Sequence, residues 1–172
     1  MTLFERLFHL AEQLRGTPQI LELISAGLDE ASANWKPAPD RFSVLEVVRH
    51  LRHTEADFIE RVELIKKGAD LPRYDPQAFM KDPRYASDSL PKALTAFRSD
   101  RAYSISILQF VPIESFTTKS RHEVLGDVSI TELMNEWAFH DLGHIRQIAE
   151  LVRSRLYYPE MGPYRDMYQI AP

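Results

Sequence analysis

The sequence predicts an all-α protein, a four-helix bundle with long crossover loops. Four segments of roughly 20 residues each carry apolar residues at helical spacing. The stretches between them are rich in proline, which favours connections over helix. The chain has 172 residues and is 44% hydrophobic, which is enough for one domain, residues 1–172, with a buried core.

Composition narrows the classes of function. The formal net charge is −4 and the charges are interspersed, so we expect no nucleic-acid partner. The chain has no cysteine, so any metal must be held by histidine, aspartate or glutamate. No apolar run approaches the roughly 20 residues of a membrane span, and the N-terminus carries charges throughout. We therefore expect a cytoplasmic protein with no membrane partner.

The first helical segment, residues 2–33, is predicted as two pieces. Gly16 followed by Pro18 is typical of a helix end and a restart, and Thr17 can cap the second piece. We expect either one bent helix or an arm followed by a helix. The apolar positions at helical spacing in the first piece are Leu3, Phe4, Leu7, Phe8, Leu10, Ala11 and Leu14. Those that supply the core face of the second piece are Ile20, Leu21, Leu23, Ile24 and Leu28.

The second helix is predicted from Val44 to about Lys67. Ser43 precedes it and Glu46 follows three residues later, the pattern of a capping box. A proline-rich loop, residues 34–41, leads into this helix. The apolar stripe of the helix consists of Val44, Val47, Val48, Leu51, Phe58, Val62 and Ile65.

The third helix is predicted from Ser89 to about Gln109, with Ser89 or Asp88 as its cap. The stretch before it, residues 68–87, contains three prolines and is long enough to cross the bundle. Such a crossover is needed where consecutive helices are not simple up-and-down neighbours.

Two further connecting regions are predicted. Residues 110–127 form an extended connection or a short hairpin, and His122 within it is either solvated or lines a site. The tail after Val152 is rich in proline and tyrosine, so we expect it to pack along the bundle or along a subunit partner.

The last helix, residues 129–152, carries two histidines within its apolar stripe, His140 and His144. Residues four apart lie one turn above each other, so both imidazoles can point at the same spot in the core. A divalent metal would give both rings a partner, since a buried imidazole needs one for each ring nitrogen. The alternative is a pair of core histidines bonded to backbone, carboxylates or water.

A third metal ligand is sought on the second helix, which carries His50 and His53. Relative to the centre of the apolar stripe, His50 lies roughly 110° away, at the edge of the buried side. His53 lies roughly 170° away and is expected to face solvent. His50 is therefore the preferred candidate.

Two carboxylates fall on buried sides of these helices, Glu55 and Asp141. An unpaired buried carboxylate is costly, so each needs a partner. As catalytic candidates, they would orient a ligand histidine or accept a proton. The alternative for each is an ion pair with an arginine from another helix.

The stretches NWKPAPDRFSVLEVVRHLRHTE and LGDVSITELMNEWAFHDLGHIRQI resemble the DinB-like, YfiT-like family of metal-binding four-helix bundles. The resemblance implies that His50, His140 and His144 are the metal ligands and that Gln147 matches the family's glutamine. It also implies an up-down-down-up bundle, commonly a homodimer, that binds zinc, nickel or another divalent ion. The allusion to DNA damage in the family name concerns gene regulation and implies no DNA binding.

The family includes thiol-dependent transferases and isomerases that use low-molecular-weight thiols. We therefore expect an enzyme in which a three-histidine metal site activates water or such a thiol for attack on a small molecule, as a hydrolase or a thiol S-transferase. The alternative is a non-catalytic, metal-stabilised dimeric bundle that binds a small ligand or serves as an interaction module. A metal-free bundle with buried histidines is a third interpretation.

Overall fold

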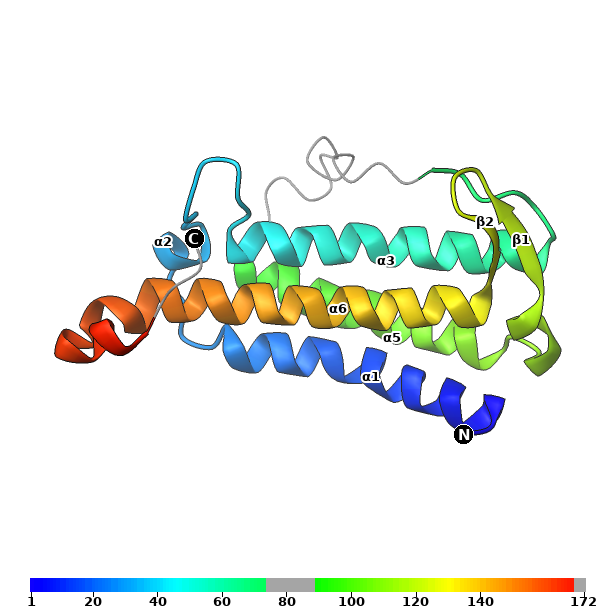
Figure 1. Ribbon diagram of the computed structural model, residues 1–172, viewed down its shortest axis with the longest axis horizontal. Coiled ribbons are helices and arrows are strands. Elements are labelled where there is room, and N and C mark those ends of the chain that lie inside the picture. The colour runs from blue at the N-terminus through cyan, green and yellow to red at the C-terminus, as the bar shows by residue number, and fades with distance from the viewer. Residues whose placement is uncertain (74–88, 169–172) are drawn as a thin grey trace.

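Four long helices lie side by side in the computed structural model, which describes residues 1–73 and 89–168 (Figure 1). They are α1 (Leu3–Ile24), α3 (Val44–Lys66), α5 (Leu90–Gln109) and α6 (Ile130–Val152). The predicted all-α four-helix bundle is therefore confirmed. Within the described residues, none of these helices has the length and apolarity that a membrane span requires.

The order of directions in the bundle is up-down-down-up, as the family resemblance implied. Helices α1 and α6 run one way and α3 and α5 run the other way (Figure 1). Helix α1 packs against α5 and α6, and α3 packs against the same two helices. The end of α3 and the start of α5 therefore lie at opposite ends of the bundle, which accounts for the predicted long crossover. Residues 74–88 of that connection lie outside the described residues.

The helix starts follow the local sequence signals. The Ser43 side chain accepts a hydrogen bond from the Glu46 amide, and the Glu46 carboxylate accepts one from the Ser43 amide, so the predicted capping box is present. The same reciprocal pair forms between Ser129 and Glu132 at the start of α6. These caps fix where both histidine-bearing helices begin, and hence which side chains face inward.

Helix α1 is continuous through Gly16 and Pro18, so the alternative of an arm followed by a separate helix is wrong. Proline has no amide hydrogen, which leaves the Leu14 carbonyl, four residues earlier, without its helical donor. Arg101 Nη1 on α5 donates a hydrogen bond to that carbonyl. The carbonyl that the proline leaves free is thus used by a neighbouring helix.

Several apolar residues of α1 that have helical spacing are exposed and do not belong to its buried side. Phe4, Phe8 and Leu23 are 71%, 62% and 76% exposed, although the sequence places Leu23 on the core face. The residues of α1 that enter the core are Leu7, Leu10, Leu14 and Leu21. The inward side is a narrow stripe, with further apolar side chains left on the surface.

A β-hairpin closes one end of the bundle. Its strands, β1 (Lys119–His122) and β2 (Gly126–Ser129), pair antiparallel, which confirms the hairpin alternative for this connection. Gly126 at the turn has φ of +80°, a conformation that glycine adopts without strain. Leu71 forms a parallel bridge to His122, so the chain after α3 lies alongside β1.

The remaining elements are short. Helix α2 (Glu30–Ala33) precedes α3, and the 3-10 turn η1 (Ile113–Thr117) precedes the hairpin. The tail forms three further turns, η2 (Arg153–Tyr157), η3 (Tyr158–Glu160) and η4 (Gly162–Met167). Tyr157, Tyr164 and Tyr168 are mostly exposed, so the described part of the tail covers little of the bundle.

The core consists of two apolar clusters. One lies toward the hairpin and includes Leu14, Phe58 and Trp137, and the other lies toward α2 and includes Leu21 and Phe97. Along every long helix, polar buried residues fall between the members of the two clusters. They are Thr17 on α1, Thr54 and Glu55 on α3, Arg101 on α5, and Asp141 on α6. A polar layer therefore crosses the middle of the bundle.

Candidate metal centre

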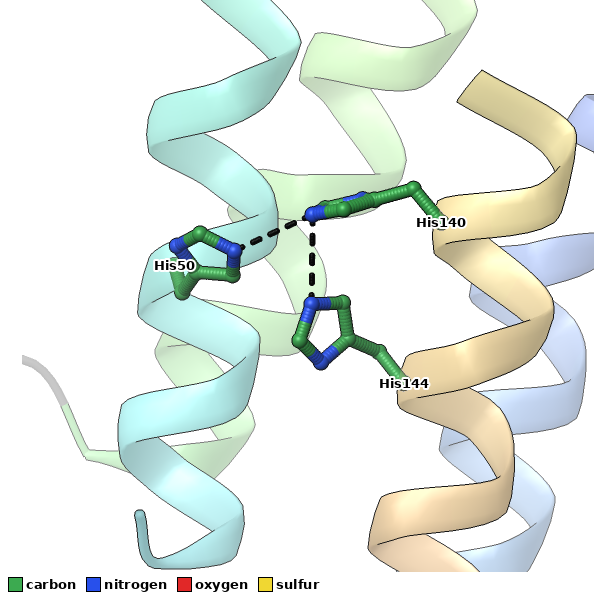
Figure 2. Close-up of side chains that lie close together, drawn as sticks. All are labelled: His50, His140 and His144. Atoms are coloured by element: carbon green, nitrogen blue, oxygen red, sulfur yellow. Dashed lines mark hydrogen bonds between the residues drawn. The ribbon is translucent and has the colours of Figure 1, made fainter. Parts of the chain in front are cut away.

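Three histidines meet in this polar layer, one from α3 and two from α6 (Figure 2). His50 Nε2 lies 3.1 Å from His140 Nε2, and His144 Nε2 lies 3.2 Å from the same atom. All three ligand-type nitrogens lie within 4.8 Å of one another. Imidazole nitrogens around one zinc ion, each at roughly 2.0–2.1 Å from it, are separated by roughly 3.0–3.4 Å. The spacing of the three rings therefore fits a shared divalent ion.

Hydrogen bonds between the rings cannot account for both close contacts. Gln147 Oε1, an acceptor, lies 2.8 Å from His144 Nδ1, so that nitrogen carries the proton and neutral His144 presents a lone pair at Nε2. His140 Nε2 can then donate to one neighbour, or accept from His50, but it cannot do both. One of the two close nitrogen contacts therefore always lacks a hydrogen bond. A cation bound by three lone pairs removes the conflict.

The protonation equilibria also favour metal ligation. Burial lowers the pKa of His50 to about 3, helped by the neighbouring rings of His144 and His140. Burial lowers the pKa of His140 to about 4, again with a contribution from His144, while Asp141 opposes the shift. Burial lowers the pKa of His144 as well, against the hydrogen bond that His144 donates to Gln147. All three rings are therefore neutral at pH 7, the state that binds a metal.

The structure separates the two candidates on α3. His50 is 6% exposed and its ring points at the two histidines of α6 (Figure 2). His53 is half-buried instead of facing solvent as predicted, and it is not part of the three-histidine group. The angular argument thus chose the residue that joins the cluster, although it placed His53 too far out.

Glu55 and Asp141, the two carboxylates selected from the sequence, share one arginine, Arg101, which the sequence analysis did not select. Arg101 Nε donates to both Glu55 oxygens, at 2.9 and 3.0 Å, and Nη2 donates to Glu55 Oε2 at 2.9 Å. Arg101 Nη1 and Nη2 donate to Asp141 at 2.7 and 3.2 Å. Thr17 Oγ1 donates to Asp141 Oδ2 at 2.7 Å. The ion-pair alternative therefore describes the contacts of both carboxylates.

The charges of this arginine cluster are fully buried, with Arg101, Glu55 and Asp141 each 2% exposed. Burial alone lowers the pKa of Arg101, but the two carboxylates raise it above its ordinary value, so the guanidinium stays charged. Burial raises the pKa of Glu55, although Arg101 acts against that shift. The guanidinium also lies 5.0 Å from the ring centre of Phe97 and 5.2 Å from that of Trp137.

A signal for Arg101 exists in the sequence. The inward stripe of α5 includes Phe97 and Ile105, and the position midway between them, four residues from each, is Arg101. A charged residue on an apolar stripe requires buried partners. Glu55 and Asp141 occupy corresponding places on α3 and α6, and the three could have been matched.

Comparison with known proteins identifies the family. The sequence model of the DinB superfamily matches residues 13–148, a span that contains all three clustered histidines. The chain belongs to the DinB superfamily. No curated protein gives a match.

Two solved structures share the fold of this DinB-superfamily chain. YfiT from Bacillus subtilis, described as a probable metal-dependent hydrolase with an unusual four-helix bundle topology, superimposes with a TM-score of 0.77. The two chains are 15% identical, and the match covers 90% of this chain and 89% of YfiT. The DinB-like protein YjoA from Bacillus subtilis gives a TM-score of 0.60 at 14% identity, covering 85% of this chain and 91% of YjoA.

Two cavities reach the histidine cluster of this DinB-superfamily protein. Each has a volume of about 720 Å³, and both are lined by Glu136, His140 and His144. The first also has aromatic walls, including Trp35 and Phe139, and the second extends toward the hairpin. A ligand of substantial size can therefore approach the cluster from either side.

Glu136 is a second residue that the sequence reading missed. It lies one turn before His140, so it belongs to the same face of α6. Although the side chain is open to both cavities, desolvation by the surrounding protein raises the pKa of Glu136, with Asp57 and Asp141 adding to the effect and Arg61 opposing it. The spacing of Glu136, His140 and His144, four residues apart in each step, is the signal that could have found it.

Proposed function

We propose that this protein is a metal-dependent enzyme that activates water or a low-molecular-weight thiol for attack on a small molecule. The observation that carries the proposal is the convergence of three neutral imidazoles, of whose two close Nε2–Nε2 contacts only one can be a hydrogen bond. The likeness to YfiT, described as a probable metal-dependent hydrolase, supports it. The reaction is hydrolysis or thiol S-transfer, which the same site could serve.

The proposed ligands are His50, His140 and His144, and the proposed ion is zinc or nickel. Three protein ligands leave coordination positions open, as in catalytic sites. When bound, such an ion lowers the pKa of a coordinated water or thiol and polarises an electrophile. The two cavities provide access for the small molecule and, in the transfer reaction, for the thiol.

The neighbouring side chains have distinct proposed roles. Glu136, in the wall of both cavities with a raised pKa, accepts the proton released by the nucleophile. Gln147 orients His144 through its hydrogen bond to Nδ1. Glu55 and Asp141, which we expected either to orient a histidine or to accept a proton, are assigned the orienting role. Their contacts with Arg101 hold α3, α5 and α6 relative to one another. Both carboxylates would therefore orient the histidines through the helices that carry them.

Metal content tests the ligand set. After purification without chelators, we expect one zinc or nickel ion per wild-type chain by elemental mass spectrometry. His50→Ala, His140→Ala and His144→Ala should each lose most of that metal, because every substitution removes one of three ligands. The matched control is His53→Ala on α3, which should keep wild-type metal content. Near-stoichiometric metal in all three ligand variants would end the proposal.

Turnover separates the enzyme from the alternative, a non-catalytic bundle that binds a small ligand in these two cavities. The assay combines a panel of activated esters and amides with a panel of electrophiles offered together with cysteine or glutathione. We expect chelation to abolish one of these reactions and re-addition of metal to restore it. Chelation that lowers the melting temperature while no reaction is detected at any stage would favour the binding module.

The expected homodimer and the cytoplasmic location stay predictions. The exposed aromatic residues Phe4 and Phe8 of α1 offer a surface for subunit contact. Light scattering on the purified protein should give twice the mass of the 19.9 kDa chain, and a monomer mass would contradict the homodimer.

A further inference from the structure

The hairpin holds a fourth buried histidine, His122, which the proposed mechanism does not use. It ends β1 and is 7% exposed. The turn that follows folds back over the ring, so His122 Nδ1 accepts hydrogen bonds from the backbone amides of Val124 at 3.1 Å and Leu125 at 3.2 Å. The side chain thus acts as the acceptor that organises the turn.

These two hydrogen bonds determine where the ring proton lies. An amide N–H can only donate, so Nδ1 must present its lone pair and cannot carry a proton. The proton of the neutral ring therefore lies on Nε2. His122 is consequently fixed in one tautomer, with an N–H donor on the side away from the turn.

His122 lies in the wall of the second cavity. His122 lines the cavity of about 720 Å³ that is also lined by His50, His140 and His144. Within residues 1–73 and 89–168, no protein group accepts a hydrogen bond from Nε2. Nε2 is also not among the described buried side-chain atoms that lack a partner, so this donor is accessible from the cavity. It is therefore open to an acceptor supplied by a ligand in the cavity.

A cationic side chain lines the same cavity. The Leu71 amide donates to the Arg121 carbonyl at 2.8 Å, and the Glu123 amide donates to the Leu71 carbonyl at 3.3 Å, which ties this segment to β1. Arg73, two residues further on, is exposed and lines the cavity together with His122. One face of the hairpin end thus combines a neutral N–H donor with a positive charge.

The other charged groups in this wall are occupied by each other or by backbone. Arg61 Nε donates to Asp57 at 2.7 Å, and Arg61 Nη2 donates to the Pro72 carbonyl. Glu132 accepts from the Ser129 amide at 2.8 Å as part of the cap of α6. Glu136 is assigned to the metal end of the cavity. Arg73 and His122 therefore remain for a ligand.

We propose that His122 Nε2–H and Arg73 form a carboxylate-binding subsite at the hairpin end of the cavity. The small molecule that reacts at the histidine cluster carries a carboxylate remote from its reacting atoms, and this subsite holds it. The link to the reaction rests on the proposed function, whereas the subsite itself is built from hairpin residues. His122 is accordingly a substrate-positioning residue.

Two substitutions separate the roles of the ring nitrogens. In His122→Asn, the side-chain oxygen takes the place of Nδ1 and preserves the turn, but the Nε2 donor is lost. In His122→Gln, the side-chain nitrogen takes the place of Nε2 and preserves a donor, but the acceptor of the turn is lost. Arg73→Gln removes the charge. His9→Asn, at an exposed position on α1, is the matched control.

The experiment titrates zinc-loaded protein, labelled with ¹⁵N-histidine, with benzoate and with benzamide. Benzoate should shift the His122 Nε2–H signal in a saturable way, and benzamide should bind about tenfold more weakly because it lacks the charge. His122→Asn and Arg73→Gln should each weaken benzoate binding about tenfold, while His9→Asn leaves it unchanged. His122→Gln should melt at a lower temperature than wild type yet bind benzoate more tightly than His122→Asn.

Wild-type benzoate affinity in His122→Asn would overturn the subsite, as would benzoate shifts confined to the signals of His140 and His144. Zinc content measured on the same samples keeps the two proposals apart. Bound zinc without any His122-dependent benzoate binding refutes the subsite and leaves the metal centre standing. His122-dependent benzoate binding in protein that retains no zinc supports the subsite and ends the metal centre.

Discussion

Two buried polar clusters lie next to each other in the middle of the bundle, and they differ in how well they are satisfied. In the arginine cluster, every guanidinium nitrogen of Arg101 donates a hydrogen bond, to acceptors on α1, α3 and α6. In the histidine cluster, three Nε2 atoms converge and one close contact always lacks a proton. Both clusters take side chains from α3 and α6, so the same two helices position them.

The difference separates a structural network from a binding site. A buried network with all its partners is stable without any added ligand. A buried cluster with converging lone pairs gains free energy when a cation enters. The arginine cluster should therefore govern folding, and the histidine cluster should govern metal affinity. Variants that change one cluster alone test this division of roles.

The largest effect is expected from Arg101→Met. The substitution leaves Glu55 and Asp141 buried without their cation, so the free energy of unfolding should fall by about 3–5 kcal/mol, measured by urea denaturation of the metal-free protein. Arg98→Met on the same helix is the control, because its ion pair with Glu22 is largely exposed and should contribute less than about 1 kcal/mol.

A further variant sharpens this test. Replacing Arg101, Glu55 and Asp141 together with Met, Met and Leu removes the charges in concert, and most of the lost stability should return. An Arg101→Met protein as stable as wild type would show that the arginine cluster does not stabilise the fold.

Added zinc should stabilise the metal-free protein through the histidine cluster. At a free zinc concentration of 100 times Kd, the free energy of unfolding should rise by about 2.7 kcal/mol, measured by thermal or urea denaturation. His140→Ala should show little of this rise. Equal stabilisation of wild type and His140→Ala would place the bound zinc elsewhere on the protein.

Acid should destabilise the metal-free protein through the same rings. Because the pKa values of His50 and His140 are lowered to about 3 and about 4, the unfolded chain binds protons that the folded chain does not. Their contribution to stability is complete above about pH 6.5 and is lost as pH falls through that value toward about 4 and 3.

From pH 7 to pH 6, the two rings together should lower the free energy of unfolding by about 1.4 kcal/mol, measured by urea denaturation at each pH. The double variant His50→Phe and His140→Phe should be much less sensitive over this range. An unchanged pH dependence in that variant would contradict the assignment to these rings.

The smallest effect is expected from Gln147→Ala. It removes the single hydrogen bond that fixes the tautomer of His144, so zinc affinity should weaken by about tenfold, measured by competition with a chelator. Stability of the metal-free protein should hardly change. Asn135→Ala is the control, since Asn135 is exposed on α6 and bonds only its own helix there. A Gln147→Ala protein with wild-type zinc affinity would remove Gln147 from the site.

Local signals in the sequence were sufficient for the helices and for much of the site. The apolar stripes and the capping residues Ser43 and Ser129 place α3 and α6 to within a residue. Once two helices are placed, the angle around each axis decides which side chains can meet. That argument selected His50 over His53, and it brought His140 and His144 to the same face.

Residues whose role depends on hydrogen bonds that exist only in the folded chain could not be placed in this way. Pro18 signals a helix break, and the donor that compensates for it, Arg101, comes from another helix 87 positions after Leu14. His122 lies in a connection whose fold depends on the turn that follows it. In both cases the deciding hydrogen bond is a property of the folded chain, and the local pattern is silent about it.

Pro18 has a consequence for how the bundle assembles. Pro18 leaves the Leu14 oxygen of α1 without an amide donor from its own helix, and that oxygen meets Arg101. If α1 slid along its neighbours by one turn, the guanidinium would face oxygens that are already engaged. The missing amide hydrogen of Pro18 therefore favours one position of α1 along its neighbours. Apolar side chains alone would discriminate less between that position and one shifted by a turn.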